Sequence, residues 1–285
     1  MRSHNHRISA NGLTHFVKDS GAETAPIVIL LHGFPETHAC WDKLTPMLVE
    51  AGYRVIAPDL RGFGETDMAP ATSDYQIHIG PVPDILAICD SLNISRAHIV
   101  GHDFGAPVAW ALAAQYPERF LSLTALSVGH VRAYLRAGAE QKRMGWYIVL
   151  HQMRGLCEAV YKFNNWAFVK WHWAERDTLD DVLAGIGRPG RLTAGLDWYR
   201  ANASLGRMMR PPKMGAFGEE IVRIPTLGVW GSRERYLTEE QMTLSADYVE
   251  ASWRYERLEG VSHWVPTEAS EQLAPLLLEH WRKVE

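Results

Sequence analysis

Short apolar runs rich in Val, Ile and Leu alternate along this chain with longer segments of helical pattern. One run spans 27–31 and another spans 97–100, and each leads into a turn that contains glycine. Continuous apolar strands separated by helices are typical of a mostly parallel sheet covered on both faces. Further strands are predicted at 54–57, 121–126, 226–230 and 253–258, with a closing amphipathic helix at 270–284. The alternation therefore predicts an α/β fold.

The N-terminal segment predicts a β-hairpin. Strand patterns at 7–9 and 13–18 flank Asn11 and Gly12. The dipeptide Asn-Gly is favoured in two-residue hairpin turns because both residues tolerate positive φ angles. We therefore expect the chain to open with two paired strands.

The alternation stops after Ser127 and resumes near Thr226. The segment between them shows helical patterns rich in aromatic residues and no convincing strand. Five of the 11 tryptophans of the chain lie in it, namely Trp146, Trp166, Trp171, Trp173 and Trp198. We predict a core domain of residues 1–127 and 213–285 with an inserted helical cap at residues 128–212. The cap would cover the carboxyl ends of the strands, where open α/β sheets bind ligands, and Pro211 with Pro212 would stiffen its exit.

Charge and apolar content limit the partners of the chain. It carries 29 Lys and Arg against 33 Asp and Glu, a formal net charge of −4, with no long run of like charge to bind nucleic acid. The longest apolar run, at 25–31, is far shorter than a membrane span, and the N-terminus lacks the apolar stretch of a signal peptide. The three cysteines are widely spaced and form no metal-ligand pattern. We expect a soluble, cytoplasmic protein without metal or cofactor, either a monomer or a homodimer.

The motif Gly101-His102-Asp103-Phe104-Gly105 carries the strongest catalytic signal. It follows a predicted strand and precedes a helical pattern at 106–115, which is the setting of a nucleophile elbow, here with Asp in the usual place of Ser. The flanking glycines allow backbone segments to pack closely around a strained turn. The alternative is a tight turn whose Asp103 only caps the following helix.

Three motifs together resemble the α/β-hydrolase superfamily, and within it the epoxide hydrolase branch. They are His32-Gly33-Phe34-Pro35, the segment Pro-Asp-Leu-Arg-Gly-Phe-Gly at 58–64, and the elbow motif around Asp103. The resemblance covers nearly the whole chain and implies the α/β-hydrolase fold, a mostly parallel sheet flanked by helices with an inserted cap. It also implies an oxyanion hole formed by the backbone N–H groups of Phe34 and Phe104.

An Asp nucleophile restricts the bond that is cleaved. A carboxylate that attacks a saturated carbon forms an alkyl ester, which water can hydrolyse at the carbonyl carbon of the enzyme. A Ser nucleophile would leave an inert ether. Asp103 therefore points to epoxides or alkyl halides rather than to carboxylic esters or amides, and the oxyanion hole would serve the hydrolysis of the ester.

Ester hydrolysis needs a base, and the base needs an orienting acid. The chain order of nucleophile, acid and histidine places the base at His263, which follows the last predicted strand. The resemblance places the acid at Glu234, four residues after Trp230, where the family usually has Asp. The alternative is a surface Glu234 paired with a neighbouring arginine. Some members of the superfamily carry the acid at a second position, which is Ser127 in this chain, and a serine cannot serve as the acid.

Opening an epoxide creates an alkoxide, which requires a proton donor opposite the nucleophile. Epoxide hydrolases use two cap tyrosines for this, and Tyr147 and Tyr199 match them. The alternative role for both is packing, which is what we expect of Tyr134 and Tyr161. Trp146 and Trp198, which directly precede the two matched tyrosines, are expected to anchor the cap while the tyrosines face an aromatic pocket.

The leading hypothesis is a cofactor-independent epoxide hydrolase acting on a small hydrophobic epoxide through an Asp103 ester. The second is a haloalkane or haloacid dehalogenase with the same nucleophile, in which tryptophan N–H groups of the cap hold the halide. Haloalkane dehalogenases favour Asn and Trp where this chain has Phe34 and Phe104, which disfavours halide release. The third is a non-catalytic ligand-binding protein, which would lack a member of the triad.

Overall fold

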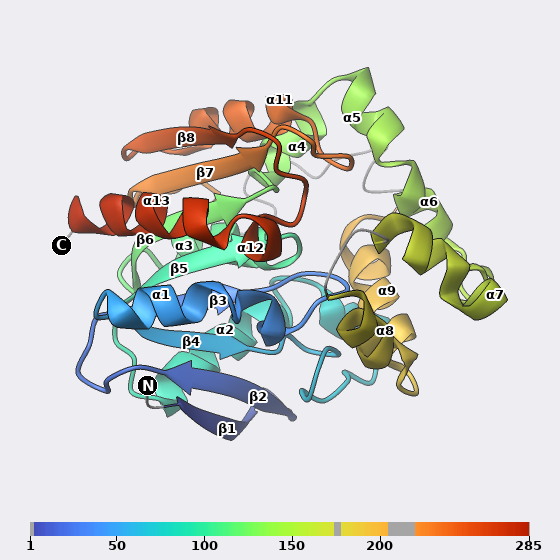
Figure 1. The fold of residues 1–285 in the computed structure, drawn as a ribbon, viewed down its shortest axis with the longest axis horizontal. Coiled ribbons are helices and arrows are strands. Elements are labelled where there is room, and N and C mark those ends of the chain that lie inside the picture. Colours follow the sequence, from blue (N-terminus) through green and yellow to red (C-terminus); the bar gives the residue numbers. More distant parts are fainter. Residues whose placement is uncertain (1–2, 174–177, 205–219, 285) are drawn as a thin grey trace.

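The computed structural model describes residues 3–173, 178–204 and 220–284. In this part of the chain, eight strands form one sheet in the order β1-β2-β4-β3-β5-β6-β7-β8 (Figure 1). The pairs β1–β2 and β2–β4 are antiparallel and all the other pairs are parallel. The strands are β1 (Ser3–Ala10), β2 (Leu13–Ser20), β3 (Ile27–Leu31), β4 (Arg54–Pro58), β5 (Ala97–His102), β6 (Phe120–Leu126), β7 (Thr226–Gly231) and β8 (Trp253–Leu258).

The two faces of the sheet pack into two separate hydrophobic clusters. Side chains alternate between the faces along a strand, so Val28 and Leu30 of β3 join one cluster while Ile29 and Leu31 join the other. Helices α1 (Leu44–Glu50) and α13 (Ser270–Arg282) supply the first cluster, and α2 (Pro81–Ser91) and α3 (Gly105–Gln115) supply the second. Burial on both faces explains why β3 reads as an uninterrupted apolar run.

The segment between β6 and β7 forms helices, and those from Trp146 onward stand to one side of the sheet in Figure 1. The helices are α4 (Val131–Arg136), α5 (Ala139–Met144), α6 (Trp146–Gln152), α7 (Leu156–Trp173), α8 (Leu179–Gly187) and α9 (Arg191–Asn202). The aromatic rings of Tyr199 on α9 and Phe104, just after β5, lie 4.6 Å apart between centroids. The inserted helices therefore meet the sheet where its parallel strands end.

The remaining short helices belong to the flanking segments. They are η1 (His38–Trp41), η2 (Thr72–Tyr75), α11 (Glu239–Thr243), η3 (Leu244–Tyr248) and α12 (Val265–Glu268). Among the described residues, no helix is long and apolar enough to cross a membrane. The predicted division into residues 1–127 with 213–285 and a cap at 128–212 stays a prediction, because its second boundary and the Pro211–Pro212 exit lie outside the described residues.

The predicted strands agree with the observed ones to within a few residues. The predicted runs at 27–31 and 253–258 coincide with β3 and β8, while β5 continues two residues beyond the predicted end at 100. The hairpin turn is present as predicted, with φ angles of 49° at Asn11 and 77° at Gly12. β1 extends beyond its short predicted range because its residues are mostly exposed and many are polar. β2 continues two residues beyond its predicted end at 18.

Candidate active site

Asp103 sits at the tip of a strained turn between β5 and α3. Its φ angle is 48°, in the region that L residues with side chains rarely adopt. A Cβ atom at Gly105 would overlap the carbonyl oxygen of Leu31, and one at Gly33 would overlap the Asp103 side chain itself. Glycine at these two positions therefore lets the turn pack against the end of β3 with Asp103 between them.

The carboxylate of Asp103 is held from two directions. Its Oδ1 accepts a hydrogen bond of 2.8 Å from the backbone N–H of Phe34, and its Oδ2 lies 3.5 Å from Nε2 of His263. Burial alone would raise the pKa of Asp103, but the hydrogen bond and the charge of His263 hold it below its ordinary value. Asp103 is therefore ionised at neutral pH and available as a nucleophile. Phe104 lies at the start of α3, and a contribution from its N–H to an oxyanion hole stays a prediction.

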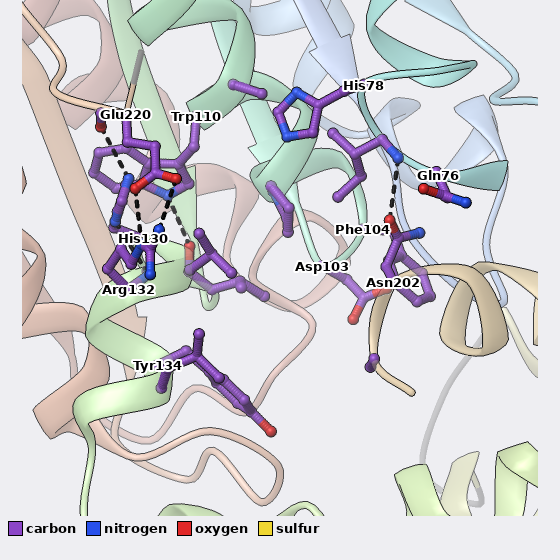
Figure 2. A pocket seen from close by; sticks show the side chains of 18 of the residues that line it. Gln76, His78, Asp103, Phe104, Trp110, His130, Arg132, Tyr134, Asn202 and Glu220 are labelled. Carbon is purple, nitrogen blue, oxygen red and sulfur yellow. Dashed lines mark hydrogen bonds and ion pairs between the residues drawn. The ribbon is translucent and has the colours of Figure 1, made fainter. Parts of the chain in front are cut away.

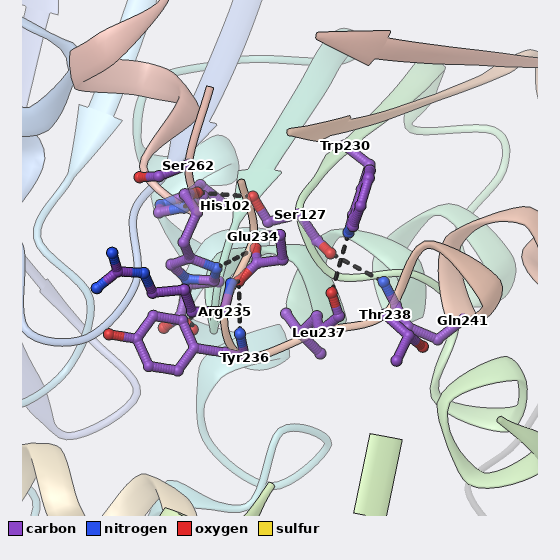
Figure 3. Close-up of polar contacts among 12 residues, drawn as sticks. His102, Ser127, Trp230, Glu234, Arg235, Tyr236, Leu237, Thr238, Gln241 and Ser262 are labelled. Carbon is purple, nitrogen blue, oxygen red and sulfur yellow. Dashed lines mark hydrogen bonds and ion pairs between the residues drawn. The ribbon is translucent and has the colours of Figure 1, made fainter. Parts of the chain in front are cut away.

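His263 and Glu234 form a short hydrogen-bonded pair next to Asp103. Nδ1 of His263 lies 2.6 Å from Oε2 of Glu234, whose carboxylate is fully buried. The other oxygen, Oε1, accepts hydrogen bonds of 2.8 Å from the backbone N–H groups of both Arg235 and Tyr236 (Figure 3). Glu234 is therefore not a surface residue paired with an arginine. The contact with Nδ1 leaves Nε2 of His263 facing Asp103.

The charges around His263 decide its protonation. Burial alone would lower the pKa of His263, but the carboxylates of Glu234 and Asp103 together raise it to about 10. His263 is therefore cationic at neutral pH while Asp103 carries its charge. The charge of Asp103 is one of the causes of this raised pKa, so a reaction that removes the charge lowers the pKa of His263.

Two residues near the end of the sheet hold the main chain of His263. The carbonyl oxygen of His263 accepts hydrogen bonds from Oγ of Ser127, at 2.7 Å, and from Nε2 of His102, at 2.9 Å. The sequence analysis identified His102 only as part of a motif and Ser127 only as a missing acid. Contacts across more than 130 positions have no local sequence pattern, so this support became visible only in three dimensions.

Tyr147 on α6 and Tyr199 on α9 lie close to each other and line the same cavities as Asp103. Their ring centroids are 6.0 Å apart in an edge-to-face arrangement, and the ring of Tyr199 also lies 5.7 Å from that of Phe34. Burial raises the pKa of both hydroxyl groups well above the ordinary value for tyrosine, and the Asp103 carboxylate adds to this. Both tyrosines therefore keep their protons at neutral pH and can donate them to a hydrogen-bond acceptor.

A large cavity opens beside Asp103. It has a volume of about 420 Å³ and is lined mostly by apolar side chains, with Asp103, Tyr147 and Tyr199 among its walls. Figure 2 shows Asp103 on one side of this space and the ion pair of Arg132 and Glu220 on the other. Arg132 and Glu220 neutralise each other through two hydrogen bonds of 2.7 and 2.9 Å. The cavity therefore suits an apolar group.

A second and smaller cavity shares the same three residues. It has a volume of about 30 Å³ and is also lined by His263 and by the cap residues His151 and Tyr161. Tyr161 was expected to serve only for packing, and no sequence pattern pointed to His151. Both residues line the small cavity with Asp103 because of how α6 and α7 pack together, which no local pattern reveals.

The tryptophans beside the two tyrosines differ in their environment. Trp198 is fully buried, and its indole N–H donates a 3.1 Å hydrogen bond to the carbonyl oxygen of Arg61 in the core. Trp146 is 52% exposed. The expectation of an anchoring tryptophan is confirmed for Trp198 and wrong for Trp146, because α9 packs between other elements while this part of α6 faces outward. The side chain of Trp173 lies outside the described residues.

The described residues offer no cluster of three or more His, Cys, Asp or Glu side chains that could hold a metal ion. Cys40, Cys89 and Cys157 are buried and none of them forms a disulfide bond.

Known proteins resemble this chain over most of its length. Residues 26–163 match the α/β hydrolase fold family. Epoxide hydrolase 4 of Mus musculus is 30% identical over 274 residues, which cover 91% of this chain and 74% of the mouse protein. The AB hydrolase superfamily protein YfhM of Bacillus subtilis (strain 168) is 29% identical over 294 residues, which cover 96% of each chain.

The fold is also shared with solved structures. The crystal structure of an epoxide hydrolase from Vigna radiata superposes with a TM-score of 0.82 at 25% identity, over 99% of this chain and 98% of that one. The crystal structure of epoxide hydrolase A from Mycobacterium thermoresistibile gives a TM-score of 0.81 at 24% identity and covers all of this chain. This chain therefore belongs to the α/β-hydrolase superfamily, and within it to the epoxide hydrolase branch.

Proposed function

We propose that this protein hydrolyses epoxides to vicinal diols through a covalent ester on Asp103, without a cofactor. The observation that carries the proposal is the placement of two protonated tyrosines, Tyr147 and Tyr199, around the same cavities as the Asp103 carboxylate. A nucleophile faced by two protonated hydroxyl groups provides what ring opening of an epoxide needs. The names of the mouse and Vigna radiata relatives support the same reaction.

The first step forms the ester. Phe34 holds one carboxylate oxygen of Asp103, and the other attacks a ring carbon while the bond from that carbon to the epoxide oxygen breaks. The oxygen that leaves takes a proton from Tyr147 or Tyr199. The enzyme then carries a hydroxyalkyl ester of Asp103 and a tyrosinate that recovers its proton from solvent.

The second step hydrolyses the ester. Ester formation removes the charge of Asp103, so the pKa of His263 falls and the imidazole releases its proton. This release balances the proton taken up by the tyrosinate. Neutral His263 then removes a proton from water, the resulting hydroxide attacks the carbonyl carbon of Asp103, and Glu234 stabilises the imidazolium.

The tetrahedral intermediate carries negative charge on Oδ1 of Asp103. The backbone N–H of Phe34 already lies 2.8 Å from this oxygen in the resting enzyme, so stabilising the intermediate requires little rearrangement. The intermediate collapses with departure of the diol oxygen, which receives a proton from His263. Asp103 and His263 then return to their charged resting states.

Halide release is less well supported by the same site. The dehalogenase alternative would use tryptophan N–H groups of the cap to hold the leaving halide. The N–H of Trp198 is already donated to the carbonyl oxygen of Arg61, and Trp146 is largely exposed. The tyrosines are the donors that line both cavities beside Asp103.

A trapping experiment tests the proposal directly. The His263→Gln variant should react with an aryl epoxide and accumulate an ester on Asp103, which intact-protein mass spectrometry detects as a mass increase equal to the substrate. The double variant His263→Gln with Asp103→Asn is the control and should gain no mass. If an adduct forms with an alkyl halide but with no epoxide, the reaction is dehalogenation and not epoxide hydrolysis. If the wild-type enzyme makes no diol from any epoxide, epoxide hydrolysis is rejected.

A further inference from the structure

The small cavity beside the nucleophile has one wall from the cap and one from the core. His151 and Tyr161 belong to the cap wall, and Tyr236 and His263 belong to the core wall. Asp103 lines this cavity as well as the large one. A substrate bound at Asp103 can therefore direct one substituent into each cavity, while the hydrolytic water belongs on the core side, next to His263.

The two cavities differ strongly in size. The large one has about 420 Å³ and the small one about 30 Å³. A water molecule requires on the order of 10 to 15 Å³ by this measure, so the small cavity accommodates a group of one or two heavy atoms. A bulky substituent must therefore occupy the large cavity.

His151 and Tyr161 form a hydrogen-bonded pair in the wall of the small cavity. Nε2 of His151 lies 2.8 Å from the hydroxyl oxygen of Tyr161, and each residue is 2% exposed. The ring of His151 also lies 4.2 Å from that of Tyr199 and 5.4 Å from that of Tyr147. The pair is therefore adjacent to both proposed proton donors.

The Tyr161 hydroxyl retains hydrogen-bonding capacity in either tautomer of His151. If the hydroxyl donates to Nε2, its lone pairs can accept a hydrogen bond from a ligand. If Nε2–H donates instead, the hydroxyl proton can be donated to a ligand. Burying this pair among aromatic rings costs more than burying two apolar side chains would, and a few convergent polar groups in an apolar pocket are typical of ligand recognition.

We propose that His151 and Tyr161 form a polar subsite that recognises a hydroxyl group on the smaller substituent of the substrate. The inference rests on the proposed epoxide hydrolysis and names its substrate class. The preferred substrate is a 2,3-epoxy alcohol, with a long apolar chain on one ring carbon and a hydroxymethyl group on the other. The chain occupies the large cavity and the hydroxymethyl group binds at Tyr161.

A matched set of substrates tests this subsite. We compare 2,3-epoxydecan-1-ol with 2,3-epoxydecane, which lacks the hydroxyl group, and with 1,2-epoxydecane, which has no second substituent. The wild-type enzyme should show a kcat/KM for the epoxy alcohol about tenfold above that for 2,3-epoxydecane, as expected for one hydrogen bond to a substrate hydroxyl.

The variant Tyr161→Phe removes only the hydroxyl and should abolish this preference. Its kcat/KM should fall about tenfold for the epoxy alcohol and stay within about twofold for the other two substrates. His151→Phe should lose the same preference, and the double variant should lose no more than either single one, because the two residues act as a unit. Tyr255→Phe, a matched change at a tyrosine that donates a hydrogen bond to Glu239 and lines neither cavity, should behave as wild type.

The outcomes separate the subsite from the proposed function. An equal loss on all three substrates in Tyr161→Phe would make the pair structural and overturn the subsite. A wild-type enzyme that hydrolyses 1,2-epoxydecane and shows no preference for the epoxy alcohol would overturn the subsite and leave epoxide hydrolysis standing. An enzyme that opens none of the three epoxides but forms the Asp103 ester with an aryl epoxide would overturn the subsite alone. An enzyme that opens neither these three nor the aryl epoxide would overturn epoxide hydrolysis and the subsite with it.

Discussion

Nδ1 of His263 lies 2.6 Å from Oε2 of Glu234, although the two residues follow different strands. Glutamate has one methylene more than aspartate, and the backbone N–H groups of Arg235 and Tyr236 fix the second oxygen of this longer side chain. The carboxylate is thus held in place and aimed at the imidazole. A glutamate at this position is suited to orient the base of the proposed reaction.

Replacing Glu234 by Gln should slow ester hydrolysis by about 10³-fold, because the amide holds the imidazole less well and does not stabilise its cation. Formation of the ester should change little. Single-turnover measurements with an aryl epoxide resolve the two steps. Glu250→Gln, the same chemical change at an exposed residue paired with Arg223, is the control. Equal slowing of both steps would contradict a role limited to orienting His263.

Replacing Tyr199 by Phe should slow ring opening by about 10²-fold, because one of the two donors to the leaving oxygen is lost. Hydrolysis of an ester that has already formed should proceed at nearly the wild-type rate. Burst-phase kinetics measure the two steps separately. If both steps slowed alike, Tyr199 would be a packing residue.

The raised pKa of His263 predicts a pH dependence of stability. The pKa is about 10 in the folded protein, against about 6.5 for an unfolded histidine, so the folded state binds the proton more tightly. The resulting stabilisation is complete below about pH 6.5 and is lost as the pH rises towards 10. Urea unfolding between about pH 7 and pH 10 should show a steeper loss for wild type than for His263→Gln. Parallel pH profiles would contradict a cationic His263 in the resting enzyme.

The two tryptophans beside the tyrosines should differ in their contribution to stability. Trp198→Ala removes a fully buried indole and its hydrogen bond to Arg61, which should lower the free energy of unfolding by about 3 to 5 kcal/mol. Trp146→Ala removes a half-exposed side chain and should change it by no more than about 0.5 kcal/mol. Urea unfolding compares the two variants, and similar losses would contradict the observed difference in burial.

Most of the sheet could be predicted from the sequence because its strands are buried on both faces. Such strands read as continuous apolar runs, and β3 lies where the pattern placed it. The range of β8 was also predicted correctly, although this edge strand is mostly half-buried and carries charged residues. The polar, exposed β1 gave a weaker signal and its predicted range was too short. The difference in burial between Trp198 and Trp146 could not be predicted. A helical sequence pattern does not show how many sides of a helix are covered by neighbouring elements.

The sequence by itself determined the α/β fold and nominated the residues of the site. The elbow glycines and the motif around Phe34 are local patterns that the backbone geometry of these turns requires. The chain order and the family resemblance nominated Glu234 and His263 beside Asp103. Only the tertiary structure decided that Ser127 and His102 hold the main chain of His263, that the two cavities lined by Asp103 are unequal, and that His151 meets Tyr161. These relations join residues on separate elements, and packing alone sets their distances.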